Sequence, residues 1–297
     1  MRRLRRCLLL VLLWPLASLA AGEILLTGAQ DNDSVRDFVE ALAARRPADT
    51  VRFIPIEQLP APGQVKTGTR LILLDLPALD WRLREPAGPP ALVLRISRVQ
   101  AYQRLGDLRP PYLSLLWSDP PLPRQLQLIR YLLPQARRVG VLYSEHSQFL
   151  LDELRHAAQP LGLEIDAQPW PDLKDNRPLQ ALLRDTDVLL GLDDPQLYNP
   201  KTAKNLLLSS YARQMALIGP NAGFVRAGAL ASTYSDQNDW LAVLDHLLDK
   251  PADQWPRTHY PEYFSVSGNQ QVARALGVEA IDPDAASQAV AAGESTR

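Results

Sequence analysis

The chain has 297 residues, of which 46% are hydrophobic and 22% are charged, and its formal net charge is −1. That length is enough for two domains of ordinary size, and the lack of a basic patch or run argues against a nucleic-acid-binding protein. Cys7 is the single cysteine, so disulfides, thiolate metal sites and a thiol nucleophile are excluded from everything that follows it.

Residues 1–22 have the pattern of a cleaved secretory signal peptide. Four arginines among the first six residues precede the apolar run Leu8–Leu16, and Ser18–Ala20 is a small-residue cleavage signal. The apolar run is too short to span a bilayer, which makes an uncleaved anchor the less favoured alternative. A lipoprotein cysteine would follow the apolar run, whereas Cys7 precedes it. We therefore expect a periplasmic protein that is not a lipoprotein, with a mature net charge of about −5.

The next hundred residues are predicted to form the strands of a first lobe. One helix is expected after Ser34, where apolar residues recur at helical spacing. The proline-rich connections 57–69 and 77–90 leave little room for crossover helices, so this lobe, residues 23–118, is expected to be reduced. The predicted strands are Glu23–Thr27, Val51–Ile56, Leu71–Leu76, Ala91–Ile96 and Tyr112–Trp117.

The segment Asp119–Pro123 (DPPLP) interrupts the pattern and predicts a boundary. A second lobe is expected over 119–235, a segment returning to the first lobe over 236–278, and a flexible tail over 279–297. Helices are predicted near residues 122–133, 149–161, 179–184, 202–213 and 239–248. Strands are predicted at 138–143, 163–167, 187–192, 216–218 and 228–231.

Alternating strands and helices predict an α/β fold with parallel sheets. Roughly ten strands fall in two groups on either side of Asp119, which indicates two Rossmann-like lobes joined by a hinge.

Ligands of parallel sheets bind beyond the carboxyl ends of the strands, so residues at those positions are the candidate ligand-binding groups. Asp193 and Glu145 suit a ligand ammonium, Asn221 and Ser144 suit a carboxylate, and the aromatic side chains suit apolar parts. Tyr234 and Asp236 are placed where a crossover to the first lobe begins, so they suit a hinge role equally well. The full candidate set is Gln30, Asp31, Trp117, Ser144, Glu145, Asp193, Tyr198, Asn221, Phe224, Tyr234 and Asp236.

The sequence lacks the usual motifs of catalysis and cofactor binding. It has no G-x-S-x-G, no phosphate-binding loop, no H-E-x-x-H and no G-x-G-x-x-G after the first strand. We expect no catalytic residue, no cofactor and no metal site. The pair Asp193-Asp194 is compatible equally with a ligand site and with turn and helix-cap chemistry. A periplasmic enzyme built on this carboxylate pair is the least favoured function.

Three segments resemble the tryptophan/tyrosine-type substrate-binding proteins of ABC transporters. Asp119–Ser144 resembles the entry to that family's second lobe, and Val225–Tyr234 (VRAGALASTY) its "aGalasy" strand. Tyr263–Gly277 (YFSVSGNQQVARALG) is similar to the family's closing strand and helix. The resemblance spans roughly Asp119–Asp282, but the family's "GN-TG" turn has no counterpart between Leu76 and Trp117.

The resemblance implies a type I periplasmic binding protein fold with three crossovers between its lobes. It implies that a small, possibly amino-acid-like ligand is held between the lobes, and that an ABC permease in the inner membrane is the partner. A ligand-sensing module that serves a receptor or sensor kinase is the alternative, because it would use the same fold. A monomer without nucleic-acid partners is expected.

Overall fold

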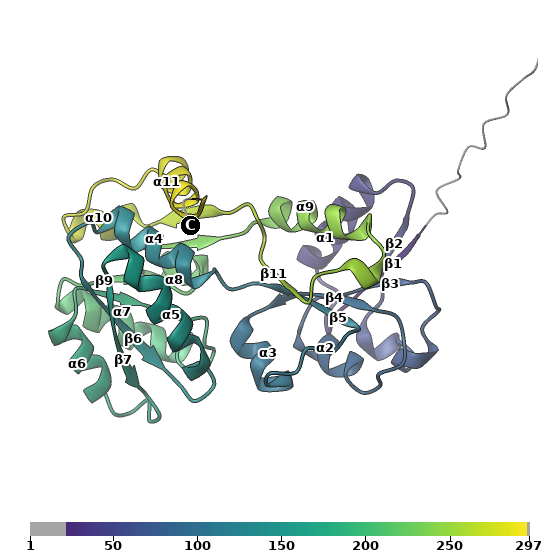
Figure 1. Cartoon of the computed structure of the whole chain (residues 1–297), viewed down its shortest axis with the longest axis horizontal. Coiled ribbons are helices and arrows are strands. Elements are labelled where there is room, and N and C mark those ends of the chain that lie inside the picture. Colours follow the sequence, from purple (N-terminus) through teal and green to yellow (C-terminus); the bar gives the residue numbers. More distant parts are fainter. Residues whose placement is uncertain (1–21, 296–297) are drawn as a thin grey trace, which may run out of the picture.

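The computed structural model describes residues 22–295, and the predicted signal peptide lies outside them except for Gly22. The chain forms two lobes, each built on a six-stranded sheet with helices on both faces (Figure 1). None of the helices in the described part of the chain combines the length and the apolar character needed to cross a membrane.

The first lobe has an entirely parallel sheet in the order β11-β5-β4-β3-β1-β2. One core cluster lies between this sheet and helices α1 and α9, and another lies beneath α2 and α3. The strands are β1 (Glu23–Thr27), β2 (Thr50–Phe53), β3 (Arg70–Leu73), β4 (Ala91–Ile96), β5 (Leu113–Trp117) and β11 (Thr258–His259). The helices are α1 (Asp33–Arg45), α2 (Leu76–Arg82), α3 (Arg98–Leu105) and α9 (Gln237–Leu248), with short 3₁₀ helices η1 (Ile56–Gln58), η2 (Pro62–Gln64) and η5 (Ala252–Gln254).

The second lobe has the sheet order β12-β10-β9-β8-β6-β7, in which only β12 runs antiparallel to its neighbour. Helices α4, α5, α10 and α11 pack on one face of the sheet, and α6, α7 and α8 on the other. The strands are β6 (Arg138–Tyr143), β7 (Glu164–Pro169), β8 (Val188–Leu190), β9 (Ala216–Ile218), β10 (Ala231–Tyr234) and β12 (Ser265–Gly268). The helices are α4 (Leu122–Leu132), α5 (Leu151–Ala158), α6 (Arg177–Asp185), α7 (Pro200–Ala212), α8 (Ala222–Ala227), α10 (Gln270–Ala275) and α11 (Pro283–Ser295), with η3 (Gln148–Leu150) and η4 (Gln159–Leu161).

The chain passes between the lobes three times, after β5, after β10 and after β11. The expectation that all of 236–278 returns to the first lobe is wrong. Helix α9 and strand β11 do return, whereas β12 and α10 belong to the second lobe. Strand β12 supplies hydrogen bonds to the otherwise open edge of β10, and Val266 is buried there.

The predicted flexible tail is also wrong, because residues 283–295 form helix α11. This helix packs on α4 and β12 and buries Ala286 and Val290. Arg124 of α4 donates to the Glu294 carboxylate at 2.9 and 3.2 Å. The small and polar residues of this segment predicted a frayed end. Their small side chains instead allow the helix to lie close to α4 and β12.

The first lobe is not reduced in its sheet, since both sheets have six strands. Its crossover helices are short, with 7 residues in α2 and 8 in α3. In the second lobe, the predicted strand 228–231 begins only at Ala231, and the residues before Gly228 form the unpredicted helix α8. Short apolar runs do not separate a buried strand from a buried helical turn.

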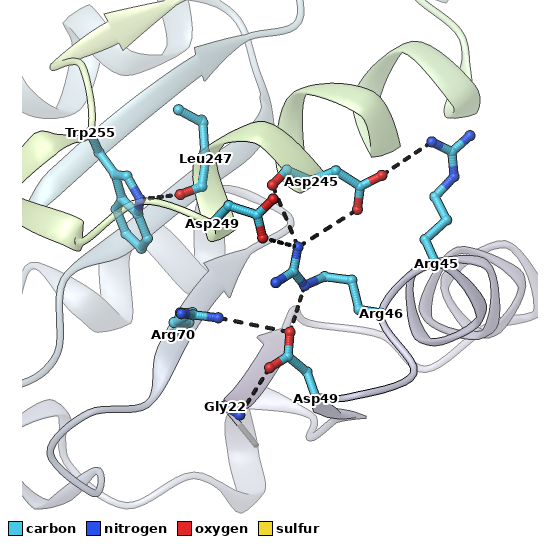
Figure 2. Close-up of polar contacts among 9 residues, drawn as sticks. All are labelled: Gly22, Arg45, Arg46, Asp49, Arg70, Asp245, Leu247, Asp249 and Trp255. Atoms are coloured by element: carbon cyan, nitrogen blue, oxygen red, sulfur yellow. Dashed lines mark hydrogen bonds and ion pairs between the residues drawn. The ribbon is translucent and has the colours of Figure 1, made fainter. Parts of the chain in front are cut away.

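An ion-pair network fixes α9 to the first lobe (Figure 2). Arg46, at the end of α1, contacts Asp49 at 2.6 Å and Asp249 at 2.9 Å. The Asp49 carboxylate also accepts a hydrogen bond from the Gly22 backbone at 2.9 Å. The returning helix therefore belongs structurally to the lobe that carries the beginning of the described chain.

Candidate functional site

The carboxyl end of β4 contacts the second lobe directly. Ser97 follows β4 and caps α3, with its side chain and that of Gln100 forming a capping box. The Ser97 hydroxyl also donates to the backbone oxygen of Asp193 in the second lobe at 3.3 Å. Because Asp193 follows β8, this contact joins the carboxyl edges of the two sheets. We call the set Ser97, Arg98, Asp119, Glu153 and Asp193 the interlobe site.

Asp119 lies in the first crossover and is 8% exposed. Its carboxylate accepts a hydrogen bond from the backbone of Arg98 at 2.8 Å. Burial, together with the charge of Asp193, raises the pKa of Asp119 to about 7. The Asp193 carboxylate is therefore close enough to oppose the ionisation of Asp119.

Asp193 follows β8 and is partly buried. Burial raises the pKa of Asp193 to about 6, a hydrogen bond from Asn221 opposes that rise, and the charge of Asp194 adds to it. A carboxyl pair of this kind favours a positively charged partner, because a cation stabilises both ionised forms.

Arg98 connects the lobes through its guanidinium group. It donates two hydrogen bonds to the carboxylate of Glu153, on α5 of the second lobe, at 2.9 and 2.7 Å. It also donates to the Tyr260 hydroxyl in the third crossover at 3.4 Å. Two parallel bonds to one carboxylate hold the lobes in a defined relative orientation.

An aromatic pair adds to this contact between the lobes. The ring of Tyr102 on α3 stacks on Phe149, which begins the turn into α5, with centroids 4.3 Å apart and planes inclined by 21°. The Arg98 guanidinium lies 5.7 Å from the centroid of the Phe149 ring. Helix α3 thus meets α5 and the turn before it through both charged and aromatic groups.

Asp194, although adjacent to Asp193, has a different role. It is fully buried and accepts hydrogen bonds from the hydroxyls of Ser144 and Ser147, both at 2.6 Å. The backbone N–H of Gln196 donates to its other oxygen at 2.9 Å. All of these contacts lie inside the second lobe, so Asp194 fixes the loops after β6 and β8, and the predicted pair divides into one interlobe and one structural carboxylate.

The other predicted candidates are distributed over several places. The Ser144 hydroxyl donates its hydrogen bond to Asp194, whereas the side chain of Glu145 is 81% exposed to solvent. Trp117 is buried in the core of the first lobe. Gln30 and Asp31 are exposed after β1, and Asp31 pairs with Arg36 of α1 at 2.8 Å.

Two further candidates, Tyr234 and Asp236, lie at the second crossover. Tyr234 lines a cavity of about 10 Å³ between the crossovers, together with Trp117 and Asp119. Asp236 caps α9 through the N–H groups of Asn238 and Asp239. Of the two roles considered for Tyr234, its position is compatible with that of a hinge residue.

Three predicted candidates line a groove between α7 and α8 instead. Tyr198 and Phe224 pack edge to face with centroids 5.7 Å apart. Asn221 caps α8 through the Phe224 N–H and also reaches Asp193, so it lies between the groove and the interlobe site. Burial raises the pKa of the Tyr198 phenol.

The strand-end rule applied to the sequence missed most of the interlobe site. Ser97 directly follows β4, and Asp119 lies two residues beyond β5, so the same rule would have selected both. Glu153 follows no strand, because it lies inside α5 and approaches Arg98 only when the lobes are adjacent. No local signal identifies a contact of that kind.

Among residues 22–295, no cluster of three or more histidine, aspartate, glutamate or cysteine side chains is arranged to hold a metal ion. The groups that meet at the interlobe site are carboxyl, guanidinium, hydroxyl and amide groups. These groups hydrogen-bond and pair with small polar molecules.

Solved structures show the same arrangement of two lobes. A ligand-free, open substrate-binding protein with adhesive properties from Clostridium difficile aligns over 88% of this chain and 97% of its own, with 16% identity and a TM-score of 0.68. An ABC domain in complex with L-Trp from Streptococcus pneumonia aligns over 87% and 95%, with 18% identity and a TM-score of 0.57. A conserved domain protein of Vibrio cholerae aligns over 90% and 97%, with 15% identity and a TM-score of 0.58.

The fold is that of the type I periplasmic binding proteins. No protein-family model and no curated protein sequence matches the chain. At identities of 15–18% the structural likeness establishes the fold, and the tryptophan/tyrosine type stays a prediction.

Proposed function

We propose that the chain is the periplasmic solute-binding component of an ABC-type uptake system, without catalytic activity. The fold supports this role, because the Clostridium difficile neighbour is described as a substrate-binding protein and the Streptococcus neighbour as an ABC domain holding L-Trp. The sequence pattern of residues 1–22 supports export to the periplasm. The partner would be a permease of the inner membrane.

Our choice of ligand rests on the two carboxyl groups of the interlobe site, those of Asp119 and Asp193. Asp119 and Asp193 approach each other where both lobes and the hinge meet, and the Arg98 guanidinium is already engaged by Glu153. The charge of Arg98 offsets the rise in the pKa of Asp119 only in part, since that pKa stays about 7, and an amine-bearing ligand would supply further positive charge to the two carboxyl groups. We propose a small ligand with an ammonium group, of which an amino acid is the simplest case.

Ligand entry requires the lobes to move apart at the three crossovers. Opening separates Ser97 from Asp193 and Arg98 from Glu153, and closure around the ligand restores such contacts in a space from which water is excluded. Exclusion of water strengthens the attraction between an ammonium group and the carboxylates. Binding should also release protons near pH 6, because the cation favours the ionised carboxyl groups.

A thermal-shift screen tests the proposal with amino acids and their amine-free analogues, such as L-tryptophan and indole-3-propionate. A ligand present at a hundred times its Kd adds about 2.7 kcal/mol to the free energy of unfolding. We expect at least one amine to raise Tm, and Asp193→Asn to abolish the shift.

Asp152→Asn is the matched control, because Asp152, one residue before Glu153 on α5, pairs with Arg155 of its own lobe. This variant should keep the shift. Stabilisation by the amine-free analogue alone, or an unchanged response of Asp193→Asn, would contradict an ammonium site between the lobes.

A further inference from the structure

A groove of about 580 Å³ runs between α7 and α8 on the second lobe. The ring of Phe224 and the side chain of Leu207, both largely buried, form part of its lining, and Ala203 and Ala227 line it as well. Leu208 also lines the groove and is 59% exposed, which is unusual for a large aliphatic side chain. This groove is an apolar surface that the fold of the described residues leaves uncovered.

The charged side chain in the lining of the groove is basic, whereas the carboxylates of Asp193 and Asp194 act on its lining residues Asn221 and Tyr198 from the loop after β8. From Pro195 to Ser235 the sequence contains no aspartate or glutamate, in a chain whose net charge is negative. Lys204 lines the groove, and Lys201 lies one turn earlier on the same exposed face of α7. In the part of the chain that the structure describes, no ion pair involves Lys201, Lys204 or Arg226.

A second groove on the same lobe provides an internal comparison. It has a volume of about 610 Å³ and lies between the end of α4 and residues 276–281. Its walls are also largely apolar, with Leu132, Leu133 and Ile281, but its charged groups are the carboxylates Asp187 and Glu279. The two grooves are thus similar in size and opposite in charge.

We propose that the α7–α8 groove is a second ligand site, separate from the interlobe site, for a free amphipathic carboxylate. The apolar part of the ligand packs on Phe224 and Leu207, and its carboxylate pairs with Lys204 at the rim. Both the apolar area and the unpaired cation are available in one cavity of the size that small-molecule sites have. Asn221 lines the groove and connects it to the interlobe site, because its side chain reaches Asp193.

Fluorescence of 8-anilinonaphthalene-1-sulfonate, an anionic aromatic probe, tests the site in the purified protein. We expect the native protein to bind the probe saturably and octanoate to displace it. Octylamine, which has the same chain length and the opposite charge, should not displace the probe. Equal displacement by octanoate and octylamine would overturn the proposal, because it would show an apolar surface without charge preference.

Two variants test whether the probe binds in the groove between α7 and α8. Lys204→Glu reverses the charge at the rim and should weaken probe binding about tenfold, equivalent to about 1.4 kcal/mol. Ala227→Trp fills the groove from the exposed side of α8 and should abolish binding. Ala280→Trp, at an equally exposed position of the α4 groove, is the control and should leave the probe's Kd unchanged.

Both altered positions of the α7–α8 groove are exposed, so the variants should fold, which circular dichroism melting curves verify. Unchanged probe affinity in Lys204→Glu and Ala227→Trp overturns the proposal. So does loss of binding in Ala280→Trp, because the probe would then occupy the acidic groove.

Discussion

The guanidinium of Arg98 on the first lobe lies 2.7 Å from the carboxylate of Glu153 on the second. The Arg98 side chain is 18% exposed and that of Glu153 is 41% exposed, so the pair is at the rim of the contact between the lobes. We expect Glu153→Gln to lower the free energy of unfolding by less than about 1 kcal/mol, because partly exposed ion pairs contribute little. Its effect on lobe orientation should be larger, since Arg98 joins α3 to α5 through two parallel bonds to this carboxylate.

Small-angle X-ray scattering should therefore show an increased radius of gyration for Glu153→Gln. Asp152→Asn, one residue earlier on α5, removes an ion pair with Arg155 that does not reach the first lobe, and should leave the radius unchanged. If the two variants scatter identically to the native protein, the Arg98–Glu153 pair does not set the relative orientation of the lobes.

The carboxyl pair makes stability depend on pH in a direction that can be worked out. Asp119 and Asp193 have pKa values of about 7 and 6 in the folded protein, whereas an unfolded aspartate has about 3.9. Between about pH 4 and pH 7 the folded state binds more protons than the unfolded state, so these groups lower the free energy of unfolding as pH rises. Below about pH 4 both states are protonated and the dependence disappears.

Asp193→Asn should remove part of this pH dependence, because the amide keeps the shape but cannot ionise. Relative to the native protein it should gain about 2 kcal/mol at pH 8 and little at pH 4. Urea unfolding at the two pH values measures this difference. An equal change in the free energy of unfolding at both pH values would show that ionisation of Asp193 does not destabilise the folded protein.

Asp194 should behave in the opposite way to its neighbour. It is fully buried and holds the hydroxyls of Ser144 and Ser147. Asp194→Ala leaves these two buried donors without their acceptor, and we expect a loss of about 3 kcal/mol. Asp193→Ala, measured by the same urea unfolding at pH 8, is the comparison and should lose much less. Similar losses would mean that the two carboxylates are equivalent.

The sequence was sufficient to predict the architecture because the relevant signals are local. Apolar runs such as Arg138–Tyr143, bounded by turn residues, correspond to buried parallel strands, and DPPLP at Asp119–Pro123 marks the first crossover. Composition did not predict the last helix, because its packing depends on the small size of its side chains rather than on their polarity. Helix α11 contains many small residues and no large aliphatic stripe, yet the burial of Ala286 and Val290 and the Arg124–Glu294 ion pair hold it on α4.

The site was predicted less well than the fold, and the reason lies in distance along the chain. Asp193 was selected because it follows a strand, and the structure places it against Ser97. Tyr198 and Phe224 satisfied the same rule but turn away into the groove between α7 and α8. A strand-end rule fixes the edge of the sheet on which a residue lies, and it does not fix the direction in which the side chain points.

The network around Arg46 supplies a last prediction, about the attachment of α9 (Figure 2). Arg46 is 13% exposed and joins Asp49 on its own lobe to Asp249 beyond α9. Burial alone would raise the pKa of Asp49, but hydrogen bonds from Arg46 and Gly22 lower it, so the carboxylate depends on these partners. Arg46→Ala should therefore lower the free energy of unfolding by about 2 kcal/mol.

Arg36→Ala is the matched control, since Arg36 also lies on α1 and its ion pairs, with Asp31 at 2.8 Å and Asp33 at 3.2 Å, do not reach α9. We expect this variant to keep nearly the stability of the native protein. Hydrogen exchange should show faster exchange in α9 for Arg46→Ala and not for Arg36→Ala, because Arg46 contacts Asp245 of α9 and Asp249 directly after it, in addition to the packing of Leu244 and Leu248. Equal exchange in both variants would show that apolar packing alone holds the returning helix.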